Sequence, residues 1–79
     1  MAVAMRNRVM IEDARNHGGF LRATWHPEAR QFVVSIWEGS VCVAATRVTL
    51  ADAPHLVAVL VDGMADAATP SAPQAATGC

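Results

Sequence analysis

The chain has 79 residues and a mass of 8.3 kDa, which limits it to one small domain. Six arginines, no lysine and seven acidic residues give a formal net charge of −1 at pH 7. Proteins dedicated to duplex DNA usually carry a large positive surplus, because phosphate neutralisation supplies most of their affinity. The balance therefore argues against that class. The two cysteines, Cys42 and Cys79, do not form a disulfide scaffold and indicate a reducing compartment.

The N-terminal residues suit neither a membrane span nor a signal peptide. No stretch reaches the roughly 18 consecutive apolar residues of a span. The first apolar run ends at Arg6, too early for the apolar region of a signal peptide. We therefore expect a cytoplasmic protein without a membrane partner.

Residues 1–18 are expected to form an N-terminal arm or a short extra strand. Residues 8–11 read Arg-Val-Met-Ile, so Val9 and Ile11 would lie on one side of such a strand. Residues 13–19 have the composition of a loop. Whether the chain starts at Met1 or Met5 is left open.

Three antiparallel strands are predicted between residues 20 and 49, at roughly 20–26, 31–38 and 41–49. The first connection, 27–30, begins with Pro27, which cannot sit in a central ladder. Gly39 supplies the positive φ angle of a tight hairpin turn at either 38–39 or 39–40.

The register follows if His26 pairs with Gln31 across the four-residue loop. Six apolar side chains then pair on one face of the first two strands; they are Leu21, Ala23, Trp25, Phe32, Val34 and Ile36. Either position of the next turn adds Val41, Val43 and Ala45. We call this the first face, and expect it to carry the core.

A helix is predicted after the sheet, with Asp52 as its N-cap and Pro54 in its first turn. Leu56, Val57, Leu60 and Met64 recur at helical spacing and form an apolar stripe. The expected fold class is α+β: a three- or four-stranded antiparallel β-meander with one C-terminal helix packed on one face. Residues 19–65 would form this βββα domain, and residues 66–79 a disordered tail.

The opposite, second face is the candidate binding face, for protein or nucleic acid. It would carry Phe20, Arg22, Thr24, Val33, Ser35 and Trp37, followed by Cys42, Ala44 and Thr46 from the third strand. With the helix on the first face, the apolar groups here would lie in water in a monomer. Exposed apolar patches mark interfaces, so we expect a homodimer that serves as a small binding or regulatory module without catalytic activity.

Single-stranded nucleic acid is the alternative ligand for this face. Aromatic side chains beside an arginine on an open sheet stack unpaired bases. Phe20 and Trp37 would stack, beside Arg22, and Arg30 and Arg47 are candidate phosphate contacts.

Catalytic and metal-binding motifs are not found. His17, His26 and His55 lack zinc-ligand spacing, and there is no P-loop, GxGxxG or GxSxG motif. A thiol-dependent enzyme using Cys42 is a weaker alternative, because His26 would lie at the other end of the sheet. We expect Cys42 to be a small buried or half-buried residue. We also expect no catalytic residue, metal, cofactor or small-molecule substrate.

The segment LRATWHPEARQFVVSIWEGSVCVAATRV, followed by an acidic N-cap and LVAVLV, resembles a group of small proteins from GC-rich Gram-positive, actinobacterial-type genomes. The resemblance covers residues 20–64 and implies a cytoplasmic bacterial origin. It brings no site residue with it. The expected topology is also similar to that of the coactivator-type single-stranded-DNA-binding domain, which is a dimer of four strands followed by a helix. This chain departs from that domain in its lack of lysine and its negative charge.

Overall fold

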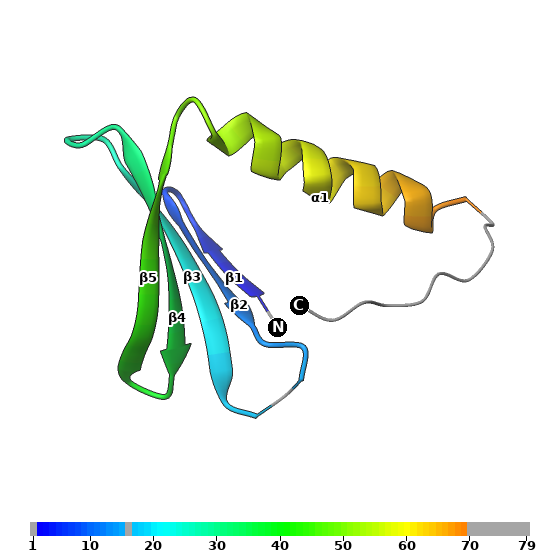
Figure 1. Cartoon of the computed structure of the whole chain (residues 1–79). Coiled ribbons are helices and arrows are strands. Elements are labelled where there is room, and N and C mark those ends of the chain that lie inside the picture. Colours follow the sequence, from blue (N-terminus) through cyan, green and yellow to red (C-terminus); the bar gives the residue numbers. More distant parts are fainter. Residues whose placement is uncertain (1, 16, 70–79) are drawn as a thin grey trace.

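The computed structural model describes residues 2–15 and 17–69 and is an α+β structure (Figure 1). Five strands form one open antiparallel sheet in chain order, β1-β2-β3-β4-β5. Their bounds are β1 Ala2–Met5, β2 Arg8–Glu12, β3 Gly19–His26, β4 Gln31–Glu38 and β5 Val41–Thr49, and the helix α1 spans Ala53–Ala67. The α+β class is confirmed, but three or four strands were expected and the sheet has five.

The additional strands, β1 and β2, lie in the N-terminal arm. In β2, Val9 pairs with Ala23 and Ile11 pairs with Leu21, so both lie on the first face as their spacing indicates. β1, Ala-Val-Ala-Met, was not expected because it is short and lacks an alternation of polar and apolar residues.

The β3–β4 hairpin has the predicted register. His26 pairs with Gln31, Ala23 with Val34, and the pairing continues to the other end of the hairpin. In the loop, the Ala29 N–H donates to the His26 carbonyl oxygen at 3.2 Å. On the first face, the rings of Trp25 and Phe32 lie with their centroids 4.7 Å apart.

A β-bulge makes the observed register of β5 differ from the expected one. Trp37 pairs with Cys42 as a regular hairpin with a turn at residues 39–40 requires, and Gly39 adopts φ 59° there. Ile36, however, pairs with Ala44, which leaves Val43 as an extra residue between the two pairs. The sequence shows no glycine or proline that would have signalled the bulge.

The bulge reverses the faces of the residues that follow it, because side chains alternate along a strand. Ala44 and Thr46 lie on the first face, although they were expected on the second. Ala45 lies on the second face, although it was expected in the core. Arg47 pairs with Val33 and joins the second face for the same reason.

The first face is almost entirely apolar across all five strands. By the register it carries Ala2, Ala4, Val9, Ile11, Leu21, Ala23, Trp25, Phe32, Val34, Ile36, Val41, Ala44 and Val48, with Thr46 and Glu38, the last residue of β4, as its polar members. Such a face requires a second layer of structure to exclude water.

The connection from β5 to α1 is a short hydrogen-bonded turn. The Asp52 N–H donates to the Thr49 carbonyl oxygen at 3.1 Å and to its Oγ1 at 3.2 Å. Asp52 occupies the predicted N-cap position but makes no side-chain capping bond, and Pro54 lies in the first turn. The helix includes Gly63 and reaches Ala67, two residues beyond the expected boundary. The rest of the expected tail, from residue 70 on, lies outside the described residues.

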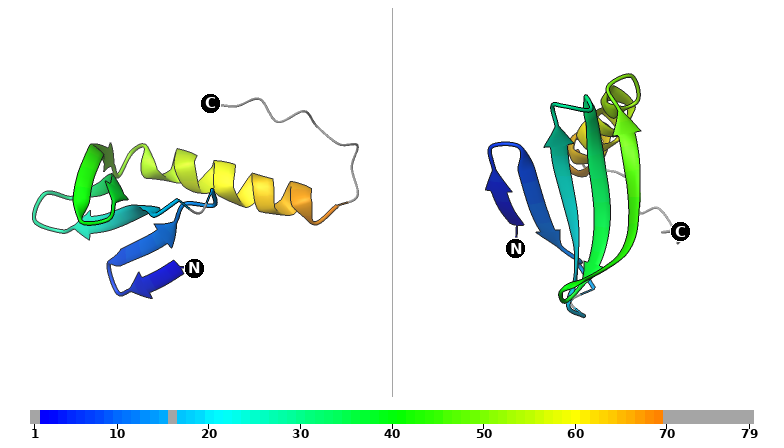
Figure 2. Two further views of the ribbon diagram at one scale, coloured as in Figure 1. Left: turned by 90° about the horizontal axis from the view of Figure 1, so that it is seen from below. Right: turned by 90° about the vertical axis from the view of Figure 1, so that its left-hand side faces the viewer.

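The helix does not pack on its own sheet, so that part of the predicted fold is wrong. It leaves the end of β5 and runs away from the strands, at an open angle to the sheet (Figures 1 and 2). Residues 54–67 are all exposed. α1 is apolar around most of its circumference, so its own sheet could cover only part of its apolar surface.

The described part of the chain has no hydrophobic core of its own. None of its hydrophobic side chains is buried, and only Gly19 and Ser35 reach that state. A single sheet buries the side chains of one face only when a second layer packs against that face. The fold therefore presents two uncovered apolar surfaces, the first face and α1.

Candidate binding face

Four side chains of β3 and β4 form a compact cluster on the second face. The rings of Phe20 and Trp37 are nearly parallel, at an interplanar angle of 7° with centroids 6.0 Å apart. The Arg22 guanidinium carbon lies 4.4 Å from the centroid of the Trp37 ring. This distance is within the range of a cation–π interaction, in which the ring's negative face attracts the cation.

Ser35 is the fourth member of this cluster. The Trp37 indole Nε1–H donates to Ser35 Oγ at 2.9 Å, and the Ser35 hydroxyl donates to the Arg22 carbonyl oxygen at 3.4 Å. Ser35 is only 4% exposed, which shows that its neighbours cover it even though the sheet has one layer. The hydrogen bonds fix the orientation of the indole, so Trp37 is positioned before any ligand arrives.

A row of four paired residues crosses the second face beside the cluster. It runs from Arg8 in β2 through Thr24 and Val33 to Arg47 in β5. Three strand spacings separate the two arginines, about 14 Å between backbones. Together with Arg22 in the neighbouring row, they place three guanidinium groups on the second face. Glu12 pairs with Phe20 and adds one carboxylate to the same face. Three positive charges and one negative charge leave the strands of this face with a formal charge of +2, despite the net charge of the chain.

All six predicted residues of the binding face lie on the second face in the structure. Phe20, Arg22, Thr24, Val33 and Trp37 are half-buried by one another, so this face is less exposed than expected. Of the two candidate phosphate contacts, only Arg47 belongs to it. Arg30 lies in the β3–β4 loop, where it is exposed and adopts φ 53°.

Arg8 and Met10 belong to this face and were missed in the sequence. They pair with Thr24 and Arg22 respectively. The alternation of Val9 and Ile11 with their neighbours was the available signal, because it assigns residues 8 and 10 to the opposite face once β2 is accepted as a strand.

Cys42 lies on the second face next to Trp37 and is exposed, contrary to the expected burial. Its thiol donates to the Ala44 carbonyl oxygen at 3.5 Å across the bulge. His26 lies at the opposite end of the strands, where its Nδ1 is 2.9 Å from Glu28 Oε1. The structure therefore does not bring the thiol and this imidazole together.

Charged side chains at the sheet ends stabilise loops. Arg15 donates to the Asp13 carboxylate, with its Nη2 2.7 Å from Oδ2. These bonds hold the pKa of Asp13 well below its ordinary value. The pKa of Glu28 is also lowered, first by its own backbone N–H and then by His26. Hydrogen bonds within the local turn therefore explain the lowered pKa of both carboxylates.

Within residues 2–15 and 17–69, no three His, Cys, Asp or Glu side chains are grouped so as to hold a metal ion. In the same part of the chain, no helix combines the length and the apolar character needed to cross a membrane.

The chain matches no protein-family model, no curated protein and no solved structure.

Proposed function

We propose that the chain is a homodimeric binding module without catalytic activity, in which a second copy covers the first face. The observation that carries this proposal is the uncovered first face together with a helix on which no side chain is buried. A fold of this size offsets its lost conformational entropy mainly by apolar burial. A partner that supplies the missing apolar layer is therefore part of the folded state.

The exposed area supports a partner of this kind. Among the described residues, twelve large apolar side chains are at least 41% exposed, and six of them lie on α1. A standard interface removes about 800 Å² from each partner. Apolar side chains at this exposure, on α1 and on the first face, are the material from which such an interface is built.

A dimer formed through the first face leaves the second face available. The positioned indole of Trp37 and the three arginines then make a surface for a ligand with flat rings or negative charge. Binding, rather than chemistry, is what these residue types support, since none of them is a typical nucleophile or general base.

Two neighbouring valines test the dimer. Val34 lies on the first face and Val33 on the second, in the same strand. Sedimentation equilibrium should show that Val34→Asp lowers the mass from that of a dimer toward that of a monomer, whereas Val33→Asp retains the dimer mass. Equal behaviour of the two variants would refute dimerisation through the first face.

Binding of single-stranded nucleic acid is the second candidate function. The row that contains Arg8 and Arg47, beside the cluster of Phe20, Arg22, Ser35 and Trp37, favours it. Three phosphate contacts would give a log–log salt dependence of about −2 for a single strand. Arg22→Ala and Trp37→Ala should weaken binding of a fluorescent oligonucleotide, and Arg22→Ala should reduce the salt slope by roughly 0.7. Arg30→Ala is the matched control, because Arg30 lies off the face. No binding by the wild-type chain at low salt would exclude this function.

A further inference from the structure

We infer that the dimer forms by reciprocal packing of helices: α1 of each copy enters the open angle between the sheet and the helix of the other, and packs on its first face. This inference rests on the proposed dimer and names the surfaces that make it. Its basis is the distribution of apolar groups on α1, the shape of the angle, and the match in length between helix and strands.

The helix is apolar over far more of its circumference than one contact surface requires. At 3.6 residues per turn, its polar residues His55, Asp62 and Asp66 fall within about 40° of one another. The large apolar residues Leu56, Val57, Leu60, Val61 and Met64 span about 140° on the other side of the helix, and each is at least half exposed. A stripe for one surface needs only about 100°.

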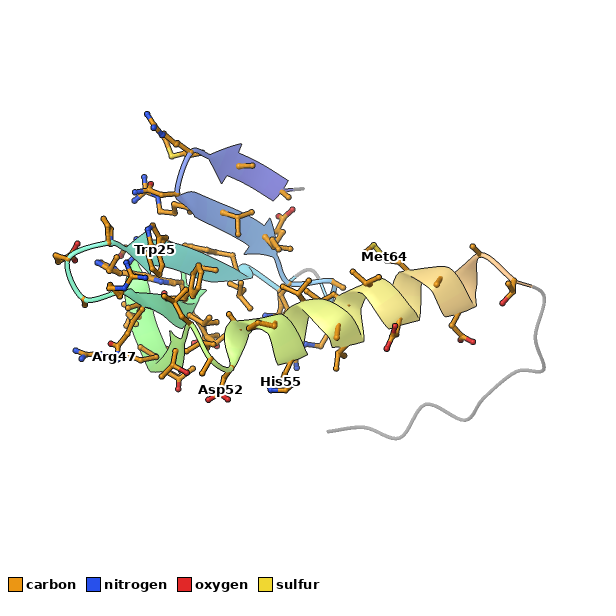
Figure 3. All side chains as sticks on the ribbon, turned by 90° about the horizontal axis from the view of Figure 1, so that it is seen from above. Trp25, Arg47, Asp52, His55 and Met64 are labelled. Atoms are coloured by element: carbon orange, nitrogen blue, oxygen red, sulfur yellow. The ribbon has the colours of Figure 1, made fainter. Side chains whose placement is uncertain are left out.

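Figure 3 shows this division at three labelled residues. Asp52 and His55 point to one side of α1, and Met64 points to the opposite side, on which β1 and β2 lie in that view. In that view Asp52 and His55 are turned away from the side of β1 and β2, whereas Asp62 of the polar stripe borders the groove between the helix and the sheet. Two apolar flanks remain, one centred on Val57 and Val61 and the other on Leu56 and Leu60.

The first flank lines an open groove of about 590 Å³ at the corner between the helix and the sheet. Phe32 of the first face and Leu50 of the connecting turn form its other wall. Leu56 and Leu60 of the second flank do not line this groove, although they are as exposed as the first flank. Folding α1 back onto its own sheet would cover one flank and leave the other in water.

A second copy covers both flanks. Under a two-fold axis, each helix contacts the partner's helix with one flank and the partner's first face with the other, so the two contacts are made twice. The dimensions agree with this arrangement. A helix of 15 residues is about 22 Å long. β4, with 8 residues, extends about 27 Å.

Disulfide trapping between two differently substituted chains tests the inference. Both chains carry Cys42→Ser and Cys79→Ser. One chain also carries Val34→Cys on the first face, and the other carries Leu60→Cys or Val61→Cys on the helix. The two are refolded together and oxidised, so that a sheet-to-helix disulfide can form only between copies. The control pairs the helix cysteine with Val33→Cys, which lies on the second face of the same strand.

The expected result is a cross-linked product that joins one chain of each kind, distinguished by a tag on one of them, and formed roughly tenfold more from the Val34→Cys mixtures than from the control, because a disulfide requires close and oriented Cα positions. A dimer in solution with no excess of that product in either mixture would overturn the reciprocal packing and leave the proposed dimer intact. A monomer at every concentration would overturn both.

Discussion

Replacing Leu60 by aspartate distinguishes a helix that is solvated from one that is buried by a second copy. In the single chain Leu60 is 57% exposed. There, an aspartate costs little beyond the difference in helix propensity, about 0.5 kcal/mol. In the dimer the same carboxylate would be placed against the partner's apolar surface.

The expected loss in the dimer is several times larger. Removing the leucine forfeits about 1 kcal/mol for the area that is still exposed in the single chain. Desolvating an unpaired carboxylate costs several kcal/mol more. A conservative loss of about 3 kcal/mol per helix occurs in both copies, so the total of about 6 kcal/mol raises the dimer dissociation constant by roughly 10⁴-fold.

Sedimentation equilibrium over a range of protein concentrations measures this change, with Val59→Asp as the matched control. Val59 is 68% exposed and lies beside the polar stripe of the same helix. The control should leave the dissociation constant within a few-fold of wild type. Equal effects of the two substitutions, or none from Leu60→Asp, would refute the burial of α1.

Three further predictions concern the sheet and its loops. The lowered pKa of Asp13, caused first by hydrogen bonds from Arg15, contributes stability above about pH 4 that is lost on acidification; Asp13→Asn should therefore flatten the acid side of the Tm–pH curve, and an unchanged curve would contradict this. Ser35→Ala removes the acceptor of the Trp37 indole and should lower the free energy of unfolding by about 1 kcal/mol in urea denaturation, against no change if the bond is unimportant. Deleting Val43 should give a regular hairpin with the same later pairs, so the chain should remain folded by circular dichroism; unfolding would contradict the bulge assignment.

The central hairpin was predictable because two local signals agreed. Pro27 and Gly39 indicated where the turns lie, and the alternation of apolar residues indicated which side chains share a face. The predicted register of β3 and β4 is therefore the observed one. The aromatic–arginine cluster follows directly from that register. Phe20 stands opposite Trp37 in the expected arrangement and in the structure.

The face on which Arg47 lies could not be predicted, because no residue type in the sequence marks the bulge that changes it. Val43 is an ordinary strand residue, and only the observed pairing of Ala44 with Ile36 reveals that it is extra. The position of α1 was also missed, for a different reason. A stripe at helical spacing indicates that a helix will be covered, but it does not say whether the covering surface comes from the same chain.

The mass of the wild-type chain in solution tests the central claim most directly. Sedimentation equilibrium, with circular dichroism of the same samples, should give about twice the chain mass of 8.3 kDa wherever the sheet and helix are folded. Dilution should dissociate and unfold the chain together, because neither copy has a core of its own. A folded species of 8.3 kDa that keeps its sheet and helix at all concentrations would contradict the account.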